Sequence, residues 1–506
     1  MSGDRWIRLL AAAALFACLP VAAPTASAPA TADPPAESPS REEPARSERS
    51  GGRDEPPIQL DTEAMDRKAG ERAARELQET MGLLERPELE AFLRRVGARL
   101  VTQAPPRRFD YEFHIVDQDA PNAFALPGGF VYVSRGLLAL TGSEDELAAV
   151  LAHEIAHVAA RHAAAQQKVA QALPGLLRWL AVGELARYSR EQEEEADRLG
   201  QQIAARAGYD PAGLVHFLEQ LENAERLELG GSRIPSFLDT HPSTRRRVAE
   251  AAHRAQTELA AIPRLAPVAP DRTAYLRLLE GLPVGESAAE GIFRGQLFVH
   301  PELGFVIRFP DGWDTRNTPL AVGARDLRHR AQVFLELQGA GADPRAAARE
   351  FLTRPENRGF SVERMEPATV GGSPAWRVIG RIGSPEGTVG VHLTFVARGG
   401  RIYRLTGAAV GFDRFRELLG VFHGVARSFR PAPPDLLAEV TELRLRLVEA
   451  AEGESLAELS ARTGNALDLD RTAVLNALWS DARLGAGQLV KIAVAEPWRP
   501  ELSSAR

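Results

Sequence analysis

The chain has 506 residues, which is longer than one compact hydrophobic core usually supports, so we expect two or three folded domains joined by linkers. Hydrophobic residues make up 44% and charged residues 25%, as in ordinary soluble proteins, and the net charge of -7 gives no basic surface for a nucleic-acid partner. The single cysteine, Cys18, excludes internal disulfides and thiolate zinc sites, so any bound metal must be held by histidine and carboxylate side chains.

Residues 1–32 have the pattern of an export signal. Basic residues precede an apolar run from Leu9 to Leu19, which is too short to span a bilayer, and small residues follow, with Ala30–Ala32 as the expected cleavage site. Two interpretations of Cys18 stand. Leu15–Cys18 resembles a bacterial lipobox, which would make the cysteine a lipid anchor, or Cys18 is one more apolar residue of the signal.

Residues 33–58 are rich in Pro, Ala, Ser, Glu and Arg and show no apolar periodicity, so we expect a disordered linker there. No later run reaches the roughly 18 apolar residues that a membrane-spanning helix needs. The sequence therefore predicts an exported protein of the periplasm or cell envelope, either free or lipid-anchored through Cys18, with no transmembrane span in the mature chain.

A small sheet is expected early in the first domain, residues 59–262, with strands at Tyr111–Asp117 and Phe130–Ser134. The segment between them contains Pro and Gly, and proline within a sheet belongs on an edge strand. Such an edge could pair with the backbone of an extended substrate. The alternative is an ordinary hairpin turn. The residues of this candidate edge strand are Asn122, Ala123, Phe124, Pro127, Gly128 and Gly129.

A helix from Leu147 to Gln171 is predicted after the capping box Ser143–Glu146. It contains His153 and His157, which stand four residues apart, so both imidazoles project from one face and can hold one metal ion. Glu154 lies beside them, placed to take a proton from an attacking water and later pass it to the leaving amine.

Zinc hydrolases usually supply a third protein ligand, and the segment Tyr188–Asp197 offers one. In a helix, Glu193 and Asp197 share a face, which suits a ligand carboxylate followed by a second carboxylate that accepts the other ring N–H of a ligand histidine. The alternative is a solvated acidic face, as in most runs such as Glu191–Glu195. The upstream histidines favour the metal-site interpretation.

Together these segments resemble the metallopeptidase family of the CAAX prenyl proteases, the HtpX membrane proteases and the periplasmic chaperone/proteases of bacteria. The resemblance covers about Ala64 to Ala255 and implies a gluzincin-like fold, one Zn2+ per chain held by His153, His157 and Glu193, and Glu154 as the catalytic base. It also makes His241 a transition-state stabiliser, or a fourth ligand in a closed resting site. The matching residues are Asn122–Gly129, His153–His157, Glu193-x-x-Ala196-Asp197, Thr240–Pro242 and Arg245–Arg247.

The chain departs from these branches in two respects. It lacks the transmembrane helices of the prenyl-protease and HtpX branches, and no helical repeat follows the peptidase region. The substrates of those branches therefore do not transfer directly to this chain.

An α+β domain with an antiparallel sheet is expected at residues 272–430, after a proline-rich boundary. Its opening, Phe305–Trp313, weakly resembles PsbP-like domains, and no catalytic cluster is expected in it. Helices are predicted at Pro344–Thr353 and Phe412–Phe429, and strands at Phe305–Phe309, Val333–Leu337, Ala375–Ile379, Val389–Val396 and Arg401–Leu405.

The last region, residues 436–496, is predicted to form a strand, two helices and a strand. Its order and the pieces Gly453–Ser455, Asn476 and Gly487–Ile492 resemble a LysM-like module, which implies peptidoglycan as a partner. The usual aromatic residue of the first strand is absent, so a purely structural module is the alternative.

The sequence thus predicts an α+β multidomain protein: a mainly helical zincin domain with a small edge-strand sheet, an antiparallel α+β domain and a βααβ module. We expect a zinc-dependent metalloendopeptidase of the bacterial cell envelope that cleaves unfolded or misassembled exported proteins, in protein quality control. The alternative is an envelope assembly factor with chaperone-like binding, anchored to peptidoglycan, whose protease activity is latched or secondary.

Overall fold

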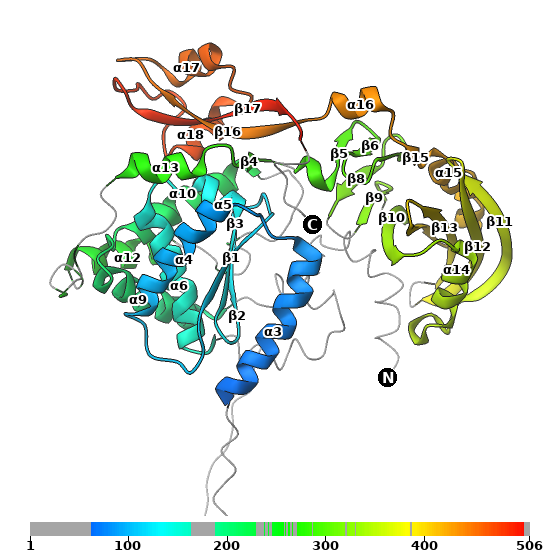
Figure 1. The fold of residues 1–506 in the computed structure, drawn as a ribbon, viewed down its shortest axis with the longest axis horizontal. Coiled ribbons are helices and arrows are strands. Elements are labelled where there is room, and N and C mark those ends of the chain that lie inside the picture. The colour runs from blue at the N-terminus through cyan, green and yellow to red at the C-terminus, as the bar shows by residue number, and fades with distance from the viewer. Residues whose placement is uncertain are drawn as a thin grey trace, which may run out of the picture.

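The computed structural model describes residues 62–162, 188–228, 237, 241, 245–257, 259, 262–263, 266 and 271–499, except for 286, 319–320, 329 and 385–386. The expected export signal, Cys18 and the linker at residues 33–58 lie outside the described residues. The fold is α+β, as predicted (Figure 1). Among the described helices, none has the length and apolar character needed to cross a membrane.

The N-terminal half surrounds a three-stranded sheet with helices. The strand order is β1-β3-β2, with β1 parallel and β2 antiparallel to β3, so β2 lies at an edge of the sheet. The strands are β1 (Glu112–Val116), β2 (Ala123–Leu126) and β3 (Phe130–Ser134). The helices are α3 (Thr62–Met81), α4 (Pro87–Val101), α5 (Arg135–Leu140), α6 (Glu144–Ala159), α9 (Arg190–Arg206), α10 (Gly213–Glu228) and α12 (Arg245–Thr257).

Helix α6 is the central element of this half, and its side chains are buried from Glu146 to Ala159. Its first turn is capped as expected, because the Ser143 hydroxyl accepts a hydrogen bond from the Glu146 amide. The predicted C-terminal end at Gln171 was wrong. The helix ends at Ala159 because Arg161 has φ 58°, a left-handed conformation that interrupts the helix, and residues 163–171 lie outside the described part.

A glycine lets α9 approach α6 closely. A side chain at Gly200 would place its Cβ 2.9 Å from the His153 amide nitrogen, so only glycine permits this spacing of the two helices. The close packing brings Glu193 and Asp197 of α9 beside the histidines of α6.

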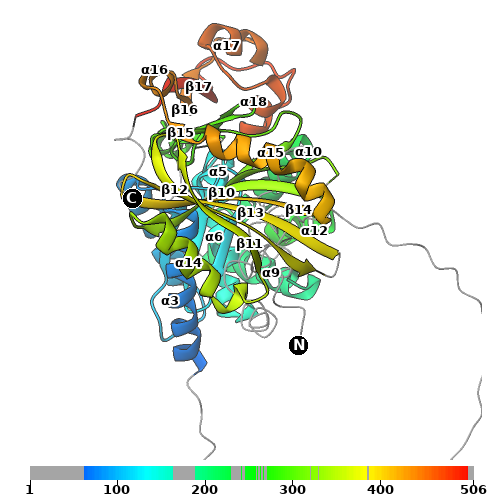
Figure 2. The same cartoon turned by 90° about the vertical axis from the view of Figure 1, so that its right-hand side faces the viewer.

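Residues 314–428 contain a seven-stranded antiparallel sheet with the order β11-β12-β13-β14-β10-β9-β8. Helix α15 covers one face of this sheet and helix α14 covers the other (Figure 2). The predicted strands from 333 to 405 fall in β10, β12, β13 and β14, and both predicted helices are present. Strand β11 was not predicted, because its side chains are largely exposed and charged and it contains Pro367, which an edge position tolerates. These elements are β8 (Asp314–Asn317), β9 (Ala321–Arg325), β10 (Ala331–Ala340), α14 (Pro344–Thr353), β11 (Ser361–Val370), β12 (Ser373–Ser384), β13 (Gly387–Arg398), β14 (Arg401–Val410) and α15 (Phe412–Ser428).

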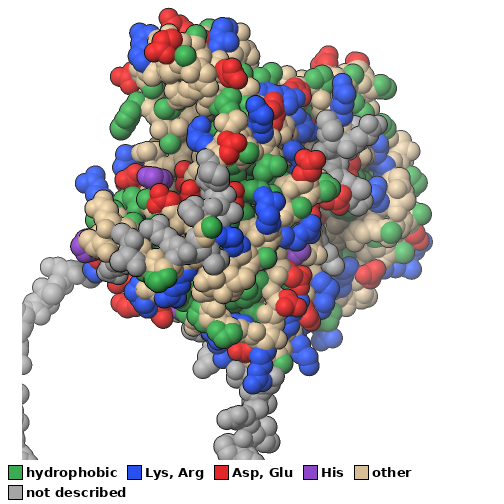
Figure 3. Space-filling model, turned by 60° about the vertical axis from the view of Figure 1, so that its left-hand side comes forward, with side chains coloured by type: hydrophobic (Ala, Val, Ile, Leu, Met, Phe, Trp, Pro, Cys, Tyr) green, Lys and Arg blue, Asp and Glu red, His purple; other side chains and the backbone are tan. Residues whose placement is uncertain are grey.

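A four-stranded sheet, β15-β7-β6-β5, shares the buried core between the seven-stranded sheet and α15, and the strand predicted at Phe305–Phe309 is its β7. The elements are β5 (Ile292–Arg294), β6 (Leu297–His300), β7 (Phe305–Arg308), β15 (Arg430–Pro431) and α16 (Pro434–Ala438). On the face drawn in Figure 3, acidic and basic side chains are interspersed among the described residues, so the visible surface carries mixed charge.

The C-terminal module, residues 441–497, has the element order β16, α17, α18, β17 and is joined to the N-terminal half. Strand β16 pairs with β17 and with β4, which follows α13. Leu445 and Leu475 of the module belong to the same buried cluster as Leu140 of α5. In Figure 1 the module lies against α13, α10 and α5. Its elements are α13 (Arg272–Leu279), β4 (Pro283–Val284), β16 (Thr441–Glu449), α17 (Leu456–Thr463), α18 (Leu469–Leu475) and β17 (Leu489–Pro497).

Candidate metal centre

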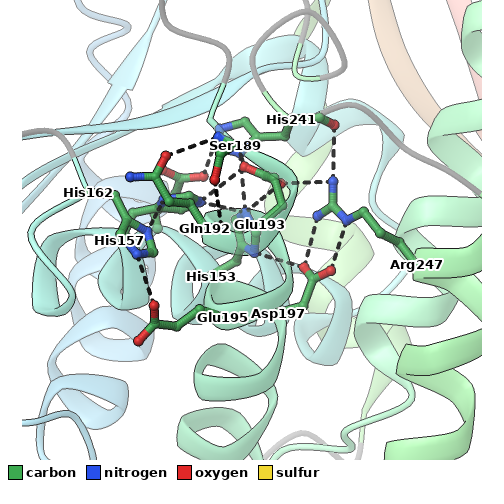
Figure 4. Close-up of polar contacts among 11 residues, drawn as sticks. His153, His157, His162, Ser189, Gln192, Glu193, Glu195, Asp197, His241 and Arg247 are labelled. Carbon is green, nitrogen blue, oxygen red and sulfur yellow. Dashed lines mark hydrogen bonds and ion pairs between the residues drawn. The ribbon is translucent and has the colours of Figure 1, made fainter. Parts of the chain in front are cut away.

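Four buried side chains converge inside the N-terminal half: His153 and His157 from α6, Glu193 from α9, and His241 from the segment between α10 and α12 (Figure 4). One ligand atom from each residue lies within 4.8 Å of the others. The His241 segment is fixed to the edge of the sheet, because the His241 amide donates to the Phe237 carbonyl and the Phe237 amide donates to the Pro121 carbonyl.

The distances between these atoms, 2.8–3.4 Å, are close to and slightly shorter than those around a single tetrahedral zinc ion. Nε2 of His157 lies 3.0 Å from Nε2 of His153, and that atom lies 3.2 Å from Nδ1 of His241. Oε1 of Glu193 lies 2.8 Å from Nδ1 of His241 and 3.4 Å from Nε2 of His157. Ligands about 2.0–2.2 Å from a tetrahedral ion stand about 3.3–3.6 Å apart, and imidazole and carboxylate are donors that zinc prefers. The residues present therefore fit a zinc ion.

The protonation states also suit a metal site. Burial, together with the neighbouring His153 and His241, lowers the pKa of His157 well below its ordinary value, which favours the neutral ring that a metal ligand requires. Burial opposes ionisation of Glu193, but the His241, His157 and His153 rings outweigh it and hold the pKa of that carboxyl well below its usual range.

A second layer of side chains orients these four. Oδ1 of Asp197 lies 3.0 Å from Nδ1 of His153, so it can accept the ring N–H on the side away from the metal group. Arg247 lies 2.8 Å from Oε2 of Glu193, pairs with both oxygens of Asp197, and donates to the His241 carbonyl. Arg247 therefore links Glu193, Asp197 and His241.

His162 and Tyr188 complete the surroundings of His157. Nδ1 of His162 lies 3.0 Å from Nδ1 of His157, and its Nε2 lies 3.4 Å from Glu195. The Tyr188 ring stacks on His157 with 3.9 Å between ring centroids. Sequence reasoning missed both residues. His162 follows His157 by five positions, which was the available signal, whereas the stacking of Tyr188 depends on how α9 meets α6.

Glu154 is fully buried between the metal group and the edge strand. Its Oε1 lies 3.6 Å from Nε2 of His241. Burial raises the pKa of Glu154, while His241, His153 and a hydrogen bond from the backbone of Ala125 lower it, and the net direction is upward. A raised carboxyl pKa is the property of a group that both accepts and returns a proton near neutral pH.

Strand β2 presents backbone groups on its outer side. The Asn122 carbonyl accepts from the Ser134 amide, so by the alternation of an antiparallel ladder Phe124 and Leu126 also bond inward to β3. The N–H and C=O groups of Ala123 and Ala125 therefore point away from β3. Both residues are buried, and the Ala125 backbone hydrogen-bonds the Glu154 carboxyl.

The remaining predicted edge residues, Pro127, Gly128 and Gly129, form the turn into β3 rather than the free edge. Both glycines have positive φ, and the turn packs against α3, where the Arg67 guanidinium donates to the Gly128 carbonyl.

A pocket opens beside the metal group along β2. Ala125, Leu126, His157, Val158 and Tyr188 are among the residues that line it. Charged side chains from α3 and from the end of α6 also line it, and among them Asp66 forms an ion pair with Arg161 at 2.7 Å. The lining of this pocket includes Ala125 of β2 and His157 of the metal group, so the pocket lies where these two elements meet.

Comparisons with known proteins agree with this geometry. Residues 84–187 and 179–255 match the model of peptidase family M48. The chain is 34% identical over 212 residues to the beta-barrel assembly-enhancing protease of Yersinia pestis, covering 37% of this chain and 43% of that protein. It is 33% identical over 172 residues to the mitochondrial metalloendopeptidase OMA1 of Schizosaccharomyces pombe, covering 31% of this chain and 50% of that protein. The chain thus spans about half or less of the length of these relatives.

Among solved structures, the cyanobacterial PsbP protein (CyanoP) of Synechocystis sp. PCC 6803 matches 29% of this chain and 98% of its own, with 15% identity and a TM-score of 0.23.

Proposed function

We propose that this chain, whose residues 84–187 and 179–255 match the model of peptidase family M48, is a zinc-dependent endopeptidase of the cell envelope that cleaves unfolded or misassembled exported proteins. The observation that carries the proposal is the buried group of His153, His157 and Glu193 with Glu154 beside it, next to an edge strand with outward backbone groups.

The residues divide the reaction between them. His153, His157 and Glu193 would hold Zn2+, which when bound polarises the scissile carbonyl and makes water acidic enough to attack. Glu154 takes the proton of the attacking water and returns it to the leaving amine, for which its raised pKa is suited. Asp197 and Arg247 keep His153 and Glu193 in place.

Unfolded chains are the substrates that this edge fits. Pairing along the outer side of β2 would use only backbone groups of the substrate, so it would select an extended conformation rather than a sequence. Folded proteins seldom offer such a segment. One relative is named a beta-barrel assembly-enhancing protease, and this name supports the proposal that the substrates are envelope proteins.

A second candidate function is a binding or assembly factor whose protease is latched at rest. The position of His241 favours it, because Nδ1 lies 3.2 Å from Nε2 of His153 and 2.8 Å from Oε1 of Glu193. His241 could therefore serve as a fourth ligand, in the position that a catalytic zinc would leave open for water. Both functions can belong to one protein if His241 leaves this position when a substrate binds. Contact with peptidoglycan through the C-terminal module, and lipid anchoring through Cys18, belong to the same proposal.

The test compares wild type with Glu154→Gln for metal content and for cleavage of unfolded casein. We expect about one zinc per chain in both proteins and cleavage only by wild type. If wild type binds zinc but leaves casein intact, the latched binding factor is the better description. If wild type binds no zinc, the ligand assignment is wrong.

A further inference from the structure

A buried lysine joins the C-terminal module to the peptidase half. Lys491 lies on β17 and is fully buried. The sequence has only three lysines, Lys68, Lys168 and Lys491, and uses arginine at its other basic positions. Burial lowers the pKa of Lys491 to about 7, against the opposing influence of Glu146, so keeping a lysine here costs free energy that an apolar residue would not.

The ammonium group binds the end of helix α5. Nζ donates to the carbonyls of Ala139, Leu140 and Thr141 at 2.8, 3.0 and 3.0 Å. The last carbonyls of a helix have no partner within the helix, and a cation is favoured at that end by the helix dipole. Three N–H bonds on one compact atom can serve three converging carbonyls, whereas the planar guanidinium of arginine could not.

Two further side chains hold the same short segment. Nε2 of Gln220 in α10 donates to the Leu140 carbonyl at 2.7 Å and to the Val474 carbonyl of the module at 3.1 Å. The hydroxyl of Thr141 lies 2.5 Å from that of Tyr275 in α13. Residues 139–141 are thus fixed from three sides, and the module contributes to two of these contacts.

The held segment leads directly into the helix of the metal group. Only Gly142 and the capping residue Ser143 separate Thr141 from α6, and the Gly142 amide donates to Glu146 at 2.7 Å. His153, Glu154 and His157 follow on the same buried helix. A displacement of the start of α6 by a fraction of an ångström would therefore pass along the helix to all three residues.

From this arrangement we propose that Lys491 is a positioning residue for the peptidase, and that the C-terminal module is a fixed part of the active fold rather than a separately tethered binding unit. The proposal rests on the proposed peptidase function for its kinetic consequence only. The module shares the buried cluster of the N-terminal half through Leu445 and Leu475, and β16 pairs with β4, so a rigid link already connects it to α5.

The experiment compares full-length wild type, Lys491→Met and Lys68→Met. Methionine keeps the length of the side chain and removes its donors, and Lys68 on the exposed side of α3 controls for loss of a positive charge. For Lys491→Met we expect casein kcat to fall about tenfold with KM and zinc content unchanged, and the visible spectrum of the cobalt-substituted protein to change. Lys68→Met should match wild type in all of these.

Amide hydrogen exchange provides a readout that needs no activity. In wild type, the amides of residues 139–147 and 489–493 should exchange with the same free energy of opening, because the two segments open together. In Lys491→Met, the amides of residues 141–147 should exchange faster than in wild type. If the module opens independently of residues 139–147 in wild type, the proposal is wrong, even if Lys491→Met fails to fold. If kcat, the cobalt spectrum and exchange of Lys491→Met all match wild type, it is also wrong. A wild type that shows cooperative exchange but no cleavage would refute only the peptidase function.

Discussion

The Arg247 guanidinium pairs with the Asp197 carboxylate through two contacts, Nε to Oδ2 and Nη2 to Oδ1, both at 2.8 Å. Both side chains are buried, and Asp197 also lies 3.0 Å from Nδ1 of His153. The His153 and Arg247 contacts outweigh the effect of burial and hold the pKa of Asp197 well below its ordinary range. The carboxylate is therefore ionised and can accept the ring N–H of His153.

We expect Asp197→Asn to weaken zinc binding about 10–100-fold, because an amide orients His153 poorly and leaves Arg247 without its partner. Competition with a chromophoric zinc chelator measures the affinity. Glu194→Gln is the matched control, since Glu194 lies on the same helix and pairs only with the exposed Arg246 among the described contacts. Equal affinities for Asp197→Asn and wild type would show that Asp197 does not support the metal site.

Much of this site could be predicted from local sequence patterns. The spacing of His153 and His157 and the capping box at Ser143 are properties of one helix, and α6 has them. Glu193 and Asp197 also share a helix, α9. Arg247 was noted only as one of the residues that match the resembled family, and its contacts could not be predicted, because they depend on how α12 packs against α9 across 50 residues of sequence.

The same limit applies to the fold. The strands β10 and β12–β14 carry buried apolar patterns and were predicted, whereas the edge strand β11, with mainly exposed side chains, was not. The contact of Lys491 with Ala139 joins residues 352 positions apart, and no periodicity in the sequence indicates it. Patterns within one element are visible in a sequence, but the partners of buried polar groups are not.

Replacing His241 by alanine should open the metal group. His153, His157 and Glu193 remain as ligands, so the zinc content should stay near one per chain. The coordination position that His241 could fill would then be open to water. We expect hydrolysis of a short unstructured peptide to increase several-fold. Loss of hydrolysis with zinc retained would instead assign His241 to stabilisation of the transition state.

Removing one outward N–H of the edge strand should weaken substrate binding. Ala123→Pro deletes the amide hydrogen that points away from β3 and leaves the inward bond between Ser134 and Asn122 intact. We expect KM for casein to rise about three- to tenfold, with zinc content unchanged. Ala123→Gly keeps the N–H and is the control. Equal KM values for the proline and glycine variants would argue against backbone pairing at β2.

Acid should destabilise the seven-stranded sheet through His392. This residue is 1% exposed on β13, and burial, with His423 and Arg377 nearby, lowers its pKa to about 3. The unfolded chain takes up a proton as the pH falls through about 6.5, whereas the folded protein does not until about pH 3. The stability that comes from keeping this ring neutral is therefore complete above pH 6.5 and is lost progressively as the pH falls toward 3.

At pH 5 this difference amounts to about 2 kcal/mol for His392, at about 1.4 kcal/mol per pH unit below 6.5. His392→Phe keeps an aromatic ring near Phe422 and removes the titrating group, so its stability should change less between pH 8 and pH 5 than that of wild type. Urea unfolding followed by tryptophan fluorescence at both pH values measures the difference. His253→Gln, at an exposed position on α12, is the control and should behave as wild type. An unchanged pH dependence in His392→Phe would mean that His392 is already protonated in the folded protein at pH 5.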